Sequence, residues 1–123
     1  MTAFLSDGFL AEAARLLAGA DPAGDASASI QYVVSGAPDG KVQVAVTIDE
    51  GRITAVDSGK VADPDLTVSL AYDEALAIVT GETSADASFM RGAVKVEGAH
   101  AVWLLELREL RAAALPVLAG LLD

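Results

Sequence analysis

The sequence contains no cysteine and a single histidine, His100. Disulfide bonds, thiolate catalysis and cysteine-based zinc sites are therefore excluded, and one histidine cannot build a histidine-rich metal site. A chain without disulfides fits a reducing compartment, and we expect a cytoplasmic protein.

Positive charge is also scarce. The chain has 8 lysines and arginines against 18 aspartates and glutamates, which gives a formal net charge of −10 at pH 7. Nucleic acid and anionic membrane surfaces both favour a basic protein face, so we expect neither as a partner. We interpret the negative charge as a contribution to solubility.

Long apolar runs are missing too. A membrane-spanning helix needs ~18 or more consecutive apolar residues, and Glu106, Arg108, Glu109 and Arg111 interrupt the longest candidates. The opening residues, MTAFLSDGFLAEAARLL, have no basic n-region, so we expect neither a secretory signal nor stable membrane insertion. The alanine-rich, lysine-poor composition hints at a bacterium with a GC-rich genome.

The chain of 123 residues predicts a single domain, residues 1–123, with a core that needs no disulfide. Its residues are 53% hydrophobic but only 5% aromatic. Such a composition indicates either a generous core or apolar surface that faces a cavity or a partner.

Local patterns predict a helix followed by three strands. Apolar residues recur at helical spacing from Phe4 to Leu17, and Gly19 ends the segment. Alternating apolar residues then predict strands at 29–34, 42–48 and 53–58, which short turns join into an antiparallel meander.

The second half predicts a fourth strand at 66–70, two short helices, a fifth strand at 93–97 and a long C-terminal helix. Gly81 should end the first short helix, and Ser84 should cap the second. The helical link of about twenty residues between strands four and five fits a parallel crossover. Pro116 should kink the last helix or begin a new segment, since it lacks an N–H. The predicted class is α+β, with a five-stranded mixed, mostly antiparallel sheet covered by helices.

No motif assigns a reaction to the chain. The sequence has neither a G-x-S-x-G nucleophile elbow nor a glycine-rich phosphate-binding motif. Asp63 and Asp65 lack the further acidic ligands of a calcium site, so we interpret them as loop residues in solvent. Acid or base chemistry would have to use the few obvious candidates, which are Tyr32, Tyr72, Asp73 and His100.

The predicted C-terminal helix carries an apolar stripe that is wider than one sheet face needs. The stripe includes Trp103, Leu104, Leu107, Leu110, Ala114, Leu115, Leu118 and Leu122. It could pack into the core and form a dimer interface, or one edge of it could line a cavity.

The segment DLTVSLAYDEALAIVTGETSADASFMRGAVKVEG resembles the sterol carrier protein-2 family. The resemblance covers Leu66 to Gly98 well, and the order of predicted elements is compatible with the family over the whole chain. Two departures are Ala71, where the family pattern favours a capping Ser or Thr, and Ala99. The matching positions are Leu70, Gly81-Glu82, Asp86, Phe89-Met90, Gly92, Lys95-Val96 and Gly98.

This resemblance implies an apolar tunnel between the sheet and the helices, with no metal and no organic cofactor. It implies a ligand that is a lipid or another hydrophobic small molecule, such as a fatty acyl chain, a sterol or an isoprenoid. Arg91 is the candidate partner for a polar head group at the mouth. The residues expected to bind the ligand are Leu70, Leu76, Val79, Phe89, Met90, Arg91, Trp103, Leu104, Leu107 and Leu110.

The leading hypothesis is therefore a non-catalytic lipid-binding protein. One alternative is a small enzyme that acts on a polyketide or terpenoid in the same cavity. The other is a dimeric interaction module with a filled core. A lipid-binding protein could also form a homodimer or act with a partner enzyme.

Overall fold

The computed structural model describes residues 4–19, 24–38, 40–60, 63–98 and 101–122. Its elements, in chain order, are α1 (Asp7–Ala18), β1 (Ala28–Ala37), β2 (Gly40–Asp49), β3 (Arg52–Ser58), β4 (Leu66–Ala71), α2 (Tyr72–Thr80), α3 (Ala85–Met90), β5 (Val94–Gly98), the π-helix η1 (Val102–Glu106) and α4 (Arg108–Gly120).

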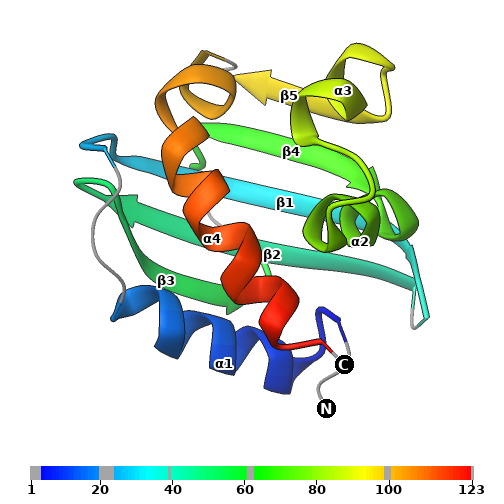
Figure 1. Ribbon diagram of the computed structural model, residues 1–123, viewed down its shortest axis with the longest axis horizontal. Helices are drawn as coiled ribbons and strands as arrows, with labels where there is room; N and C mark the ends of the chain where they lie inside the picture. Colours follow the sequence, from blue (N-terminus) through cyan, green and yellow to red (C-terminus); the bar gives the residue numbers. More distant parts are fainter. Residues whose placement is uncertain (1–3, 20–23, 39, 61–62, 99–100, 123) are drawn as a thin grey trace.

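The five strands form one sheet in the order β3-β2-β1-β4-β5. β1 with β2, β2 with β3 and β4 with β5 are antiparallel, whereas β1 and β4 are parallel. The expected mixed, mostly antiparallel sheet is therefore confirmed, and so is its cover of helices (Figure 1).

The expected parallel crossover between the fourth and fifth strands is wrong. β5 runs antiparallel to β4, with Leu70 opposite Val94 and Leu66 opposite Gly98. Two helices, α2 and α3, lie in this link. Since Val94 at the start of β5 lies opposite Leu70 near the end of β4, the chain re-enters the sheet beside the end of β4 that it left. The length of a link alone does not fix the direction of the next strand.

The sheet has one apolar and one polar face. Ile30, Val44, Val68 and Val94 are all buried on the face that the helices cover. Residues at alternate positions, such as Thr47 in β2, point to the opposite face, as period-two alternation requires. In Figure 1, α4 crosses the sheet diagonally, α1 lies along β3, and α2 and α3 cover β1, β4 and β5. The core therefore lies between the sheet and one layer of helices.

Local signals fix the ends of the short helices as the sequence predicts. The Ser84 hydroxyl accepts a hydrogen bond from the Ala87 N–H at 3.0 Å and so caps α3. Gly81 ends α2 in the left-handed conformation, with φ 86°. Gly92 turns the chain from α3 into β5 with φ 79°. Ala71 precedes α2 without a side-chain cap.

The C-terminal helical region is divided at Leu107 rather than at Pro116. The π-helix η1 ends at Glu106, and α4 includes Pro116 and continues to Gly120. A π-helix shifts the register of the backbone hydrogen bonds. Here the Leu107 N–H donates to the Val102 carbonyl at 2.8 Å.

Candidate functional site

A cavity of about 190 Å³ lies between the apolar face of the sheet and the helices. One water-sized group occupies roughly 10–15 Å³ by a comparable measure, so the cavity has room for on the order of a dozen such groups. Its wall is almost entirely apolar. Among the residues from α1, the sheet, α2 and α4 that form it are Phe9, Leu10, Val44, Val46, Val56, Val68, Ala75, Ala114 and Leu118.

Five of the ten expected ligand-binding residues line this cavity. Leu70 reaches it from β4 and Val79 from α2. Trp103, Leu107 and Leu110 reach it from η1, the junction and α4. Leu70 and Val79 belong to the segment that resembles the family, and the other three belong to the C-terminal helical region. The structure thus brings both groups of residues to the wall of one cavity.

Four other expected residues, Leu76, Phe89, Met90 and Arg91, are not among the described residues that line the cavity. Phe89 is partly buried against the core, and Leu76 packs against the group of buried residues that includes Phe4 and Phe9. Met90 is 85% exposed because it stands opposite Ala85 and Ser88, the buried residues of α3. The side chain of Leu104 lies outside the described part of the structure. A role for any of these in ligand binding remains a prediction from the sequence.

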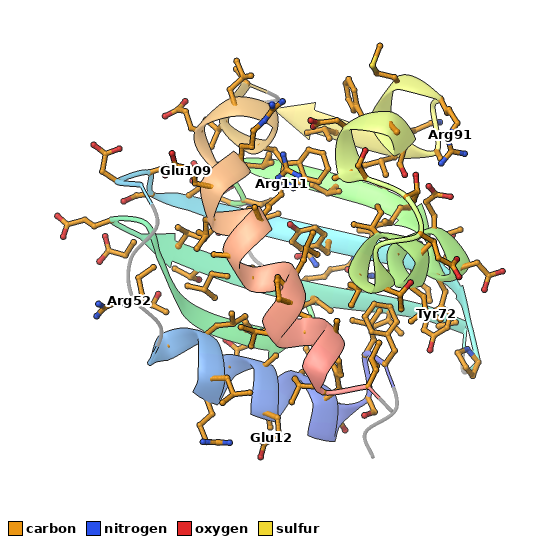
Figure 2. The ribbon with its side chains drawn as sticks, viewed as in Figure 1. Glu12, Arg52, Tyr72, Arg91, Glu109 and Arg111 are labelled. Atoms are coloured by element: carbon orange, nitrogen blue, oxygen red, sulfur yellow. The ribbon has the colours of Figure 1, made fainter. Side chains whose placement is uncertain are left out.

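Arg91 lies away from the cavity, beside α3 (Figure 2). Its Nη2 lies 2.7 Å from Oε2 of Glu74 in α2, and the Ser88 hydroxyl donates to the same carboxylate. The hydrogen bond from Ser88, followed by the bond and charge of Arg91, lowers the pKa of Glu74 below its ordinary value. Arg91 therefore ties the end of α3 to α2. The prediction that it meets a ligand head group receives no support from this position.

One cationic residue of the cavity wall escaped the sequence analysis. Arg111 lines the cavity, and its side chain is only 17% exposed. Figure 2 shows it beside the start of α4, on the side of α3, whereas Glu109 lies on the other side of α4. The helical spacing could have predicted this position. Arg111 follows Leu107 by four residues and so lies on the same, apolar side of the helix.

Arg111 belongs to a polar cluster at this end of the cavity. Its Nε donates to the Trp103 carbonyl at 3.1 Å, and its guanidinium carbon lies 4.5 Å from the centre of the Trp103 ring. The Trp103 indole N–H donates to the Tyr32 hydroxyl at 3.1 Å. Burial raises the pKa of Tyr32 and lowers the pKa of Arg111. Tyr32 is therefore a neutral phenol near pH 7, and Arg111 remains a cation because its ordinary pKa is so high.

An outer groove adjoins the cavity between α2, α3 and α4. Asp86 and Arg108 line the groove but not the cavity. The residues common to both walls are Ile78, Val79, Ala85, Arg111 and Leu115. The groove and the cavity therefore lie on two sides of the same side chains.

The candidates for acid or base chemistry do not converge. Tyr32 lies on the cavity wall, but Tyr72 donates to the Phe4 carbonyl at 3.4 Å and Asp73 is exposed. His100 lies outside the described residues. Among the described residues, no cluster of three or more His, Cys, Asp or Glu side chains could hold a metal ion. None of the described helices is both long enough and apolar enough to cross a membrane.

Comparison with known families finds one match. The model of the SCP-2 sterol transfer family matches residues 13–104, which is most of the chain. The search of curated proteins gives no match.

Solved structures share the fold. The crystal structure of sterol carrier protein 2 has a TM-score of 0.79 at 13% identity, covering 95% of this chain and 98% of that chain. A conserved hypothetical protein from Thermus thermophilus also has a TM-score of 0.79 at 13% identity, with 98% and 90% covered. Palmitated SCP2L2 from Aedes aegypti has a TM-score of 0.59 at 18% identity, with 93% and 90% covered. At these identities the likeness shows the fold.

Proposed function

This chain belongs to the SCP-2 sterol transfer family, and we propose that it binds a lipid or another hydrophobic small molecule in its apolar cavity, without catalysing a reaction. The ligand would be a fatty acyl chain, a sterol or an isoprenoid.

The observation that carries this proposal is the cavity itself. A space of about 190 Å³ stays open inside a small domain, and its wall is almost wholly apolar. Interiors of proteins are normally packed to crystal density, so a space of this size loses packing energy unless a ligand fills it. The open cavity also argues against an interaction module with a filled core.

The size of the cavity suits a chain of about a dozen carbons. Each methylene that moves from water into the cavity contributes ~0.8 kcal/mol, so a dozen would contribute about 10 kcal/mol before the costs of association. Those costs are estimated at roughly 4–15 kcal/mol. Affinity should therefore depend strongly on how completely the ligand fills the space. The palmitated state of the Aedes aegypti relative agrees with an acyl ligand for this fold.

A chain-length series tests the proposal. The single tryptophan of the chain, Trp103, is 3% exposed and lies on the cavity wall, so its fluorescence reports on occupancy directly. Titration with straight-chain acids from octanoic to hexadecanoic acid should increase affinity about fourfold for each added carbon, until the cavity is full. An affinity that does not change with chain length, or no fluorescence response to any acid, would contradict the proposal.

A further inference from the structure

Arg111 is the one charged side chain among the described residues that line the cavity. Placing a cation beside an apolar cavity costs free energy unless opposite charge or hydrogen-bond acceptors compensate it. Its position on the wall therefore raises the question of what the guanidinium contributes to binding.

Three contacts hold the guanidinium in one orientation. Nε donates to the Trp103 carbonyl, the guanidinium lies over the Trp103 ring, and Nη2 lies 3.7 Å from Oδ1 of Asp86. The indole of Trp103 is itself anchored on Tyr32. A guanidinium fixed in this way loses little freedom when a ligand binds, which favours tight and oriented binding.

Arg111 shares its acidic partner with a second arginine. Nη2 of Arg108 lies 2.9 Å from Oδ2 of Asp86, much nearer than Arg111 lies to Oδ1. Two cations thus face one carboxylate. Asp86 lines the outer groove and not the cavity, so an anion that reaches Arg111 from the cavity does not have to displace it.

We propose that Arg111 selects the ligand: it binds the ionised carboxylate at one end of an amphiphile whose apolar tail fills the cavity. A carboxylate supplies one negative charge and two acceptor oxygens, which match the donor fork of a guanidinium. The head then lies where the cavity meets the outer groove, and the tail extends toward Phe9 and Val44. This inference rests on the proposed function, because it concerns the same cavity.

The test compares two ligands with the same tail: one has an ionised carboxylate head, and the other has a neutral methyl ester head with one additional carbon. Binding of radiolabelled dodecanoic acid and methyl dodecanoate is measured by equilibrium dialysis at pH 7.5. The wild-type protein should bind the acid at least about tenfold more tightly than the ester, the effect of one charge-assisted hydrogen bond on a binding constant. The R111M variant should lose this preference, so that its affinities for the acid and the ester differ by less than about twofold.

A second arginine provides the matched control. Arg91 is 56% exposed, is paired with Glu74 and does not line the cavity, so R91M should keep the full preference for the acid. The R111K variant keeps the positive charge but lacks the paired N–H donors of the guanidinium, so it should retain only part of the preference for the acid.

The possible outcomes distinguish failure of the role of Arg111 from failure of the proposed lipid binding. Equal binding of acid and ester by the wild-type protein, or a preference that survives in R111M, would overturn the role of Arg111 and leave lipid binding intact. If neither the acid nor the ester binds, both the proposed function and this inference are overturned. If R111M does not fold, the wild-type ratio and R111K still decide.

Discussion

The substitution A114L is expected to fill part of the cavity. Ala114 is 7% exposed, lies on α4 and belongs to the cavity wall. Leucine adds three carbons, which need roughly 30–45 Å³ on the scale in which one water-sized group takes 10–15 Å³. The cavity of about 190 Å³ can take them in. Leucine also suits a helix nearly as well as alanine does, so α4 should be undisturbed.

The expected change in the free energy of unfolding follows from the apolar area that the new carbons remove from water. Three methylene-sized groups contribute about 2.4 kcal/mol, from which the lost side-chain freedom of leucine subtracts about 0.5–1 kcal/mol. The ligand-free A114L protein should therefore be about 1–2 kcal/mol more stable than the wild type. A well-packed site would respond in the opposite direction, with a loss of about 1–3 kcal/mol from overpacking.

The same change should weaken the binding of long ligands. A ligand that fills the wild-type cavity would lose the burial of about three methylenes, which corresponds to roughly a fiftyfold lower affinity. Octanoic acid, which leaves space unused, should be affected much less. The assays are urea unfolding of the delipidated protein and titration with acids of increasing length.

The control is A113L, the same change on the exposed side of α4. It should alter stability by less than about 0.5 kcal/mol and leave affinity unchanged. Destabilisation of A114L by more than about 1 kcal/mol, together with unchanged affinity for hexadecanoic acid, would refute the existence of an open cavity at this position.

Three further predictions concern the frame around the cavity. A methyl group on Gly98 would lie 2.6 Å from the Asp65 carbonyl, and φ there is +94°. G98A should therefore cost at least about 1 kcal/mol more than G36A, which has a similar φ and open space, and equal losses in urea unfolding would contradict this packing. The Ser84 cap of α3 predicts that S84A loses about 1 kcal/mol, and an unchanged midpoint would contradict a stabilising cap. Because the pKa of Glu74 is lower in the folded protein, its stabilisation is complete above about pH 4.5 and is lost as pH falls through the folded value. E74Q should thus be less stable than the wild type at pH 7, and the difference should shrink as pH falls below about 4.5; a pH-independent difference would contradict the pairing with Ser88 and Arg91.

The sequence carries most of the information about the fold. Alternation in β1, β2 and β4 marks the apolar face, and Gly81, Ser84 and Gly92 mark where the short helices begin and end. The direction of β5 could not be predicted, because a strand of five residues has the same alternation in either direction. The π-helix η1 also has no reliable sequence signal, since its register shift depends on packing.

The site was predictable only in part. Residues on the apolar stripe of the C-terminal helix, such as Trp103 and Leu107, reach the cavity because that stripe must cover the sheet. Met90 was expected on the wall because of the family resemblance, but the buried residues of α3 are Ala85 and Ser88, on the other side of this short helix. Arg111 was overlooked because its charge was considered only as an interruption of an apolar run, although its spacing from Leu107 places it on the buried side of α4.

The central claim is that the cavity holds a hydrophobic ligand. The most direct measurement is native mass spectrometry of protein purified under gentle conditions, combined with solvent extraction and mass spectrometry of the extract. We predict a stoichiometric adduct that the extraction removes and identifies as a lipid or isoprenoid. A protein that carries no adduct and also fails to take up any added acyl chain would contradict the account.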